Sequence, residues 1–143
     1  MVYQIVSERR ADPYRISCPS DAFKIFERYS KARTERFVVA TLNGAHDVIR
    51  VHLVTIGLVS RTVVHPREVL ITAIKDNAVA YIACHNHPSG HLDPSPEDRE
   101  ITNRLHDASE IIGISMLDHV IVGPHGGWFS FVEHGLLEPP RPD

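Results

Sequence analysis

The sequence predicts an α/β domain in which helices pack on a mixed β-sheet. Strand-like and helix-like segments alternate along the chain in the order β-α-β-β-(β)-α-β-α-β-β. The run AVAYIAC at 78–84 is continuously apolar, as expected for a strand that is buried on both faces. Turn signals at 43–44 and 124–127 predict hairpins, so antiparallel pairs must accompany the strands that helices connect.

The chain has 143 residues, the length of one domain. Its composition, with 43% hydrophobic and 23% charged residues, is typical of a globular protein and argues against wholesale disorder. We find no internal repeat or linker. We therefore expect a single domain over residues 1–138 and a disordered tail at 139–143, where Pro, Arg and Asp crowd together.

Charge and cysteine content narrow the function classes. Lys and Arg number 15 against 18 Asp and Glu, and this net charge of −3 argues against a strongly basic nucleic-acid binder or a polybasic membrane module. No apolar run approaches the ~20 residues of a membrane span, and the N-terminus lacks the apolar core of a signal peptide. Cys18 and Cys84 form no CxxC motif, so we expect free thiols in a reducing cytoplasm.

The first half of the chain predicts three strands and one helix. Residues 2–6 are short and apolar enough for an edge strand, and Ser20 can cap a helix whose apolar face follows it. The β-rich run 37–42 leads through Asn43-Gly44, a strong hairpin signal, into a long strand at 48–57. Regular alternation along that strand would place Val48 and Val54 on the same face.

The second half continues the alternation of strands and helices. The expected elements, in order, are a short strand at 62–64, a helix opened by His65-Pro66, the buried strand at 78–84, a helix over 96–112 that Gly113 ends, and a hairpin of 117–122 with 128–132. The apolar stripe of the helix over 96–112 is Ile101, Leu105, Ala108 and Ile112.

Two histidines stand where the buried strand ends. His85 and His87 are two positions apart, so on a strand both side chains point to the same face and can converge on one ion. Pro88 then ends the strand and Gly90 allows a sharp turn. Such a pair is often no more than a surface feature, so the residues that follow decide its interpretation.

A helix with favourable capping residues follows the two histidines. Ser95 is placed as its N-cap, Pro96 at N1 and Asp98 at N3. The short connection can bring Asp98 back beside the histidines, which would complete two nitrogens and one carboxylate, the ligand set of a catalytic zinc site with water in the fourth position. Zinc lowers the pKa of such a water and polarises a carbonyl. Capping alone would also explain Ser95 and Asp98.

Hydrolysis also needs a general base, and three glutamates are candidates. Glu97 points roughly 100° away from Asp98 around the helix. Glu68 lies in the first turn of a helix, where interaction with the helix dipole suffices to explain it. Glu35 immediately precedes a strand and could lie at a sheet end, or it could be a solvated loop charge. Spacing alone does not choose between them.

The complete pattern resembles a known signature. HxHP at 85–88, Ser95 and Asp98 match the JAMM metalloprotease motif of the MPN (JAB) fold. The fuller text resembles the RadC family from about residue 21 to 133. The matching segments are HNHPSG at 85–90, PS at 94–95, ED at 97–98, HPRE at 65–68 and LDHVIVG at 117–123.

This resemblance implies a fold and a set of roles. It implies a three-layer α-β-α domain similar to the cytidine deaminase fold, with zinc (Zn²⁺) bound by His85, His87 and Asp98. Glu35, which precedes an aromatic-apolar strand as in the RadC pattern, corresponds to the glutamate that activates the attacking water. Ser95 corresponds to the serine that hydrogen-bonds the tetrahedral oxyanion, a role compatible with capping.

The sequence also departs from the RadC pattern. RadC proteins usually carry an N-terminal helix-hairpin-helix region, and about 20 residues before the first helix leave no room for it, which argues against autonomous DNA binding. Cys84 should face away from the ligands as a core thiol, and His91 is expected to be a loop residue. We assign structural roles and no function to three further histidines, namely His65 as a helix N-cap, His119 in a strand and His125 in a turn.

The favoured function is a zinc-dependent JAMM-type metallohydrolase that acts on a peptide or protein substrate, including isopeptide bonds to ubiquitin-like modifiers. A metal-binding accessory factor in DNA repair and a catalytically silent MPN scaffold are the alternatives. A zinc nucleoside deaminase is excluded, because it requires an HxE with a distant PCxxC and the chain has HNH at 85–87 and no CxxC.

Overall fold

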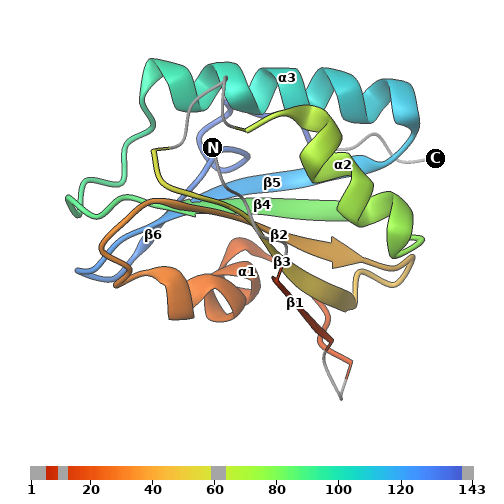
Figure 1. Cartoon of the computed structure of the whole chain (residues 1–143), viewed down its shortest axis with the longest axis horizontal. Coiled ribbons are helices and arrows are strands. Elements are labelled where there is room, and N and C mark those ends of the chain that lie inside the picture. Colours follow the sequence, from red (N-terminus) through yellow and green to blue (C-terminus); the bar gives the residue numbers. More distant parts are fainter. Residues whose placement is uncertain (1–5, 10–12, 59–63, 140–143) are drawn as a thin grey trace.

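A six-stranded mixed sheet carries helices on both faces in the computed structural model, which describes residues 6–9, 13–58 and 64–139 (Figure 1). The strand order is β1-β3-β2-β4-β5-β6. The strands are β1 (Val6–Arg9), β2 (Arg36–Leu42), β3 (Val48–Ile56), β4 (Ala80–Asn86), β5 (Ser115–Val122) and β6 (Trp128–Ser130). The helices are α1 (Pro19–Phe26), the short 3-10 helix η1 (Glu27–Tyr29), α2 (Pro66–Lys75) and α3 (Pro96–Ile112).

Strand β4 lies inside the sheet, between β2 and β5. It pairs antiparallel with β2 and parallel with β5, and the parallel pair is connected through α3. The other strand pairs are antiparallel: β1 with β3, β2 with β3, and β5 with β6. The C-terminal end of β4 therefore meets the N-terminal end of α3 at one edge of the sheet.

The sheet separates two hydrophobic cores. Helices α2 and α3 cover one face and α1 covers the other, as Figure 1 shows above and below the strands. Along β4, Tyr81 and Ala83 enter the α2–α3 core while Ile82 and Cys84 enter the α1 core. Burial on both faces explains the continuous apolar run of this strand. The predicted three-layer α-β-α fold is confirmed.

Helix α3 begins and ends where the sequence indicates. Ser95 is its N-cap, and Gly113 ends it in the left-handed conformation at φ 84°. Ile101 and Leu105 are buried against the sheet, as predicted. Ile112 is 52% exposed, so its placement in the apolar stripe was wrong. It lies in the last turn, beyond Ser109, which is the last buried residue of the helix.

The start of α1 differs from the prediction by two residues. Cys18, not Ser20, is the N-cap, because Pro19 takes the first helical turn, where its missing N–H costs no hydrogen bond. Ser20 lies inside the first turn, with its Oγ 3.2 Å from Cys18 Sγ.

The long strand β3 does not alternate regularly. Its pairing with β2 shifts register between Phe37 and Val38 and again between Thr41 and Leu42. Val48 therefore packs in the α1 core and Val54 in the α2–α3 core, so the prediction that they share a face was wrong. A β-bulge inserts one residue and reverses the facing of all residues beyond it.

Some predictions lie outside the described residues. The predicted edge strand at 2–6 overlaps them only at Val6, where β1 begins at the sheet edge. Positions 62 and 63 of the predicted short strand and positions 140–143 of the predicted tail are likewise outside, and Val64 is not in a strand. Among the helices of the described residues, none has the length and apolar character to cross a membrane.

Candidate metal centre

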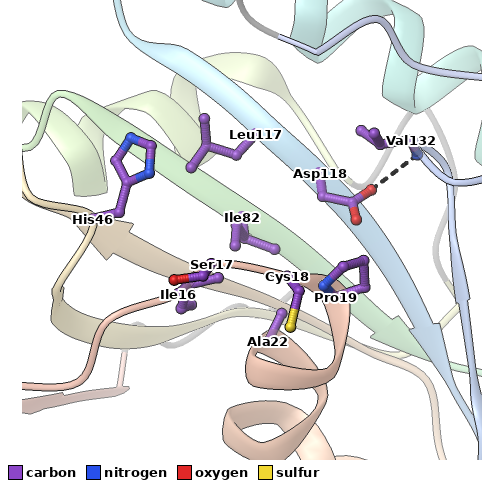
Figure 2. Close-up of a pocket in the computed structure, with 10 residues that line it drawn as sticks. All are labelled: Ile16, Ser17, Cys18, Pro19, Ala22, His46, Ile82, Leu117, Asp118 and Val132. Atoms are coloured by element: carbon purple, nitrogen blue, oxygen red, sulfur yellow. Dashed lines mark hydrogen bonds between the residues drawn. The ribbon is translucent and has the colours of Figure 1, made fainter.

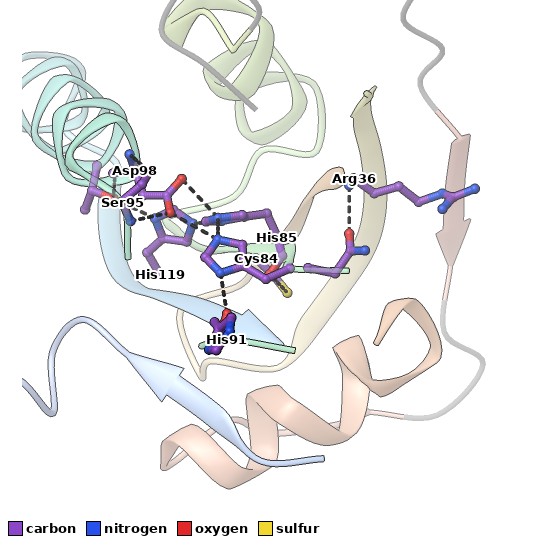
Figure 3. Close-up of polar contacts among 10 residues, drawn as sticks. Arg36, Cys84, His85, His91, Ser95, Asp98 and His119 are labelled. Carbon is purple, nitrogen blue, oxygen red and sulfur yellow. Dashed lines mark hydrogen bonds and ion pairs between the residues drawn. The ribbon is translucent and has the colours of Figure 1, made fainter. Parts of the chain in front are cut away.

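His85, His87 and Asp98 converge at the junction of β4 and α3. Figure 3 labels His85 and Asp98 there. His85 Nε2 lies 2.9 Å from His87 Nε2. The Asp98 carboxylate faces both rings, with Oδ1 3.1 Å from His85 Nε2 and Oδ2 3.1 Å from His87 Nε2. Among the described residues, His85, His87 and Asp98 form the one group of His, Cys, Asp or Glu side chains whose ligand atoms are close enough together to hold a metal ion.

The loop after β4 returns the chain to the ligands. The His87 backbone N–H donates to the Val122 carbonyl at 2.8 Å, which keeps the residue beside the end of β5. Gly90 then turns the chain at φ 90°. A Cβ added to Gly90 would lie 2.4 Å from His125 Cδ2, so conformation and space both require glycine here.

The start of α3 fixes Asp98, the third candidate ligand, through a capping box. Ser95 Oγ accepts the Asp98 N–H at 3.1 Å, and Asp98 Oδ2 accepts the Ser95 N–H at 2.8 Å. The same carboxylate therefore caps the helix and faces His85 and His87. The capping and ligand interpretations of Asp98, which the sequence left as alternatives, are compatible in this geometry.

The electrostatics of the centre favour a cation between the three side chains. Burial acts to raise the pKa of Asp98, but the hydrogen bonds from His85, His87 and the Ser95 backbone outweigh it and hold the pKa well below its usual range. Burial likewise acts to lower the pKa of His87, but Asp98, the His91 carbonyl and the charge of Glu35 raise it. A carboxylate and two ring nitrogens facing inward attract either a shared proton or a metal ion.

Each of the two candidate ligand histidines is oriented by a second hydrogen bond. His87 Nδ1 lies 2.7 Å from the His91 backbone carbonyl, which can only accept, so Nδ1 carries the proton and Nε2 faces the centre. His85 Nδ1 lies 2.8 Å from Nε2 of His119, a fully buried residue of β5. The His91 side chain is exposed, as expected for a loop residue.

Sequence reasoning missed the contact of His119 with the ligands. The prediction of a strand position was correct, but it assigned the residue no role. The parallel register pairs His119 with Ala83, two residues before His85, and this places the two imidazoles side by side. The only signal in the sequence was the position of His119 within the family-like segment LDHVIVG.

Asn86, between the two ligand histidines, holds the segment that carries Glu35. Its side chain accepts the Arg36 N–H at 2.7 Å and donates to the carbonyls of Ala32 at 3.2 Å and Thr34 at 3.0 Å. Figure 3 shows the Arg36 bond beside the centre. Phe37 pairs with His85 in an antiparallel register, so continuing this register brings Glu35 opposite His87. The negative charge of Glu35 raises the pKa of His87. Asn86 also escaped the sequence analysis.

The other two candidate bases are placed differently. Glu97 is exposed on the first turn of α3. Glu68 lies in the first turn of α2, 3.7 Å from the Arg67 guanidinium. His65 caps that helix by accepting the Arg67 N–H at 3.2 Å, as predicted.

Cys84 takes no part in the ligand set. Its side chain enters the α1 core, on the opposite face from the ligands, and it is fully buried. Burial raises the pKa of its thiol well above the usual value, which opposes the thiolate that metal binding requires. The prediction that it faces away as a core thiol is confirmed.

Away from the metal centre, a hollow of about 250 Å³ lies on the α1 side of the sheet (Figure 2). Asp118 lines it, but this carboxylate already accepts the N–H groups of His119 at 2.7 Å and Val132 at 3.1 Å, and the hydroxyl of Ser130. Burial raises the pKa of Asp118. The Asp118 carboxylate therefore stabilises the fold through these hydrogen bonds.

Fold and site together define an α/β domain with a candidate metal centre at one sheet edge. The family model of the RadC-like JAB domain matches residues 16–136, so the chain belongs to this family. Family membership follows from the match over most of the chain and does not depend on a bound metal.

Relatives named "UPF0758 protein" are similar over most of this chain. Those of Rubrobacter xylanophilus and Trichlorobacter lovleyi are 46% and 45% identical, over 85% and 86% of this chain and 53% and 54% of their own lengths. That of Symbiobacterium thermophilum is 51% identical over 77% of this chain and 47% of its own length. The chain thus spans about half the length of the curated relatives it matches.

Proposed function

We propose that the protein is a zinc-dependent metallohydrolase of the JAMM type, acting on peptide or isopeptide bonds. The observation that carries the proposal is the convergence of His85 Nε2, His87 Nε2 and the Asp98 carboxylate within 4.8 Å of one another. Two nitrogens and one carboxylate oxygen are a ligand set of catalytic zinc sites that leaves a position open. When bound, zinc would lower the pKa of a water molecule and polarise a carbonyl.

Glu35 is the proposed general base. It stands on the segment that Asn86 fixes beside the ligand strand, close enough for its charge to affect His87. Its carboxylate would accept a proton from the attacking water and return it to the leaving amine. The Gly57 N–H donates to the Glu35 carbonyl at 2.8 Å, which fixes the backbone that carries this carboxylate.

Ser95 is the proposed donor to the tetrahedral oxyanion. Its Oγ accepts the Asp98 N–H through a lone pair, which leaves the hydroxyl proton to donate. The residue is exposed at the N-terminus of α3, where a substrate carbonyl can approach it. A hydrogen bond that strengthens as negative charge develops on that oxygen accelerates hydrolysis.

The proposed substrate is a peptide or protein, including an isopeptide-linked one, as the resemblance to JAMM enzymes implies. We propose the cytoplasm as the compartment, because Cys18 and Cys84 are both free thiols. Association with DNA repair would follow the RadC resemblance and would be indirect, since the net charge is −3.

The test is a screen of peptide and isopeptide substrates with Glu35→Gln and Glu97→Gln as a matched pair. Both variants remove one glutamate charge beside the centre, since Glu35 acts on His87 and Glu97 precedes Asp98 in the chain. Glu35→Gln should retain zinc and lose hydrolysis by about 10²–10⁴-fold, the usual contribution of a general base. Glu97→Gln should keep both.

Two outcomes would contradict this proposal. Full activity of Glu35→Gln on a substrate that the wild type cleaves would refute the base. A zinc-loaded wild type that cleaves no substrate of either class would favour a silent metal-binding scaffold over a hydrolase.

A further inference from the structure

A chain of hydrogen bonds runs from the ligand His85 back into α3. His85 Nδ1 lies 2.8 Å from His119 Nε2. His119 Nδ1 lies 2.6 Å from Thr102 Oγ1, and the Thr102 hydroxyl donates to the Asp98 backbone carbonyl at 2.8 Å. The chain thus leaves one ligand, His85, and ends on the backbone of another, Asp98.

The direction of these bonds follows from the number of protons. The Thr102 hydroxyl has a single proton, which it gives to the Asp98 carbonyl, so its oxygen must accept from His119 Nδ1–H. A neutral imidazole has one N–H, so His119 Nε2 presents a lone pair and accepts from His85 Nδ1–H. His85 Nε2 is then left with the lone pair that a metal ligand needs. The reverse direction would put a proton on that nitrogen.

The surroundings of His119 fix the position of its ring. Phe131 stacks on it, with ring centroids 4.6 Å apart, and Phe37 meets it edge-on at 5.5 Å. The side chain is fully buried between these rings. The backbone N–H of His119 donates to Asp118 Oδ1 at 2.7 Å. A ring held in this way does not turn to exchange its two nitrogens.

We propose that His119 and Thr102 are positioning residues that set the tautomer and the orientation of His85, and thereby the affinity of the centre for metal. This inference rests on the metal site of the proposed function. The second hydrogen bond of a metal-ligating histidine usually goes to a carboxylate, a carbonyl or water, whereas here a buried neutral histidine would fill that place.

The test compares the zinc affinity of variants by competition with a chromophoric chelator. His119→Phe keeps an aromatic ring but removes both hydrogen bonds, and it should weaken zinc binding by about 10–100-fold. His119→Gln offers an amide oxygen to His85 Nδ1–H and should recover most of that loss. Thr102→Val removes the outer bond and should cost less than His119→Phe. His106→Phe changes a half-buried histidine of α3 whose ring nitrogens face Asp107 and Glu110; it is the matched control and should bind as the wild type does.

A second measurement keeps the inference testable if His119→Phe fails to fold. Nitrogen-15 NMR of the wild-type His85 ring at pH 8 should show a proton on Nδ1 both without zinc and with zinc, and none on Nε2 once zinc is bound. An unprotonated Nδ1 in either state would overturn the proposed direction. Equal zinc affinity of folded His119→Phe and wild type would overturn the positioning role.

These readouts separate this inference from the proposed function. Neither requires hydrolysis, so a zinc-binding wild type with no activity would contradict the hydrolase alone. Wild-type zinc affinity in folded His119→Phe, together with normal hydrolysis, would contradict the positioning role alone.

Discussion

Two buried histidine–aspartate groups occupy different ends of the same sheet, and only one has the geometry of a metal centre. At one end, His52 Nε2 of β3 lies 2.6 Å from Oδ2 of Asp76, the C-cap of α2. At the other, His85 and His87 face Asp98 at 3.1 Å. Burial is similar, since His52, His85 and Asp98 are all buried.

The difference lies in what surrounds each carboxylate. Asp76 also accepts the Thr41 hydroxyl at 2.7 Å and pairs with the Arg50 guanidinium at 3.5 Å, so protein groups balance its charge. Among the ion pairs of the described residues, those of Asp98 are with His85 and His87 alone, and both rings present Nε2. A buried carboxylate with a cationic partner is structural, whereas one faced by two ring nitrogens is suited to bind a metal.

The largest expected effects come from replacing one histidine at each end of the sheet. One substitution should remove metal binding and the other should lower stability. His87→Ala should abolish zinc binding, with a loss beyond the ~10–100-fold that removal of an outer partner causes. His52→Ala should retain zinc but lower the free energy of unfolding by about 3 kcal/mol, because it breaks a buried pair. Elemental analysis and urea unfolding of the two variants measure both effects. If His52→Ala folded normally but no longer bound zinc, the distinction between a structural pair and a metal centre would be wrong.

A smaller effect should follow from Ser95→Ala, which tests whether capping and chemistry share one residue. Loss of the cap should cost about 1 kcal/mol of stability. Loss of the oxyanion donor should lower the rate of hydrolysis by about 10²–10³-fold while zinc stays bound. Chemical denaturation and steady-state kinetics measure the two losses. An unchanged rate of hydrolysis would mean that Ser95 caps the helix and takes no part in the chemistry.

The smallest effect is the pH dependence of the zinc-free and zinc-bound protein. Because the pKa of His87 is raised, its protonated form persists to higher pH and competes with zinc there. Zinc affinity should therefore fall roughly tenfold per pH unit once the pH drops below this pKa. In the zinc-free protein the pH dependence of stability has the opposite sign. Because the folded-state pKa of His87 is raised, its protonated form stabilises the fold at pH values below the unfolded-state pKa. This stabilisation is lost as the pH rises through the folded-state pKa.

Chelator competition between pH 6 and 8 measures the first part of this prediction, and urea unfolding with EDTA measures the second. His52→Ala should follow the wild-type zinc curve, because His52 lies outside the centre. A zinc affinity that does not change over this range would contradict the assignment of His87 as a ligand.

Much of the fold could be predicted because its signals are local. The apolar run of β4, the capping residues of α3 and the Asn43-Gly44 turn each act within a few residues, and the structure agrees with them. The bulges of β3 could not be predicted, because register depends on which strand pairs with it and how.

The same reasoning applies to the site. The convergence of His85, His87 and Asp98 could be predicted because they lie within fourteen residues of one another on a strand, a turn and a helix start. His119 and Asn86 could not, because their contacts arise from β4 pairing with β5 and from the segment before β2, both distant in sequence. Residues that orient a ligand from another strand carry no spacing signal.

The most direct test of the central claim is a crystal structure of the zinc-loaded protein with anomalous data at the zinc edge. We predict one peak between the three side chains, about 2.0–2.2 Å from His85 Nε2, His87 Nε2 and an Asp98 oxygen. A protein that binds zinc with no peak there, or with its peak beside His52 and Asp76, would contradict the assignment.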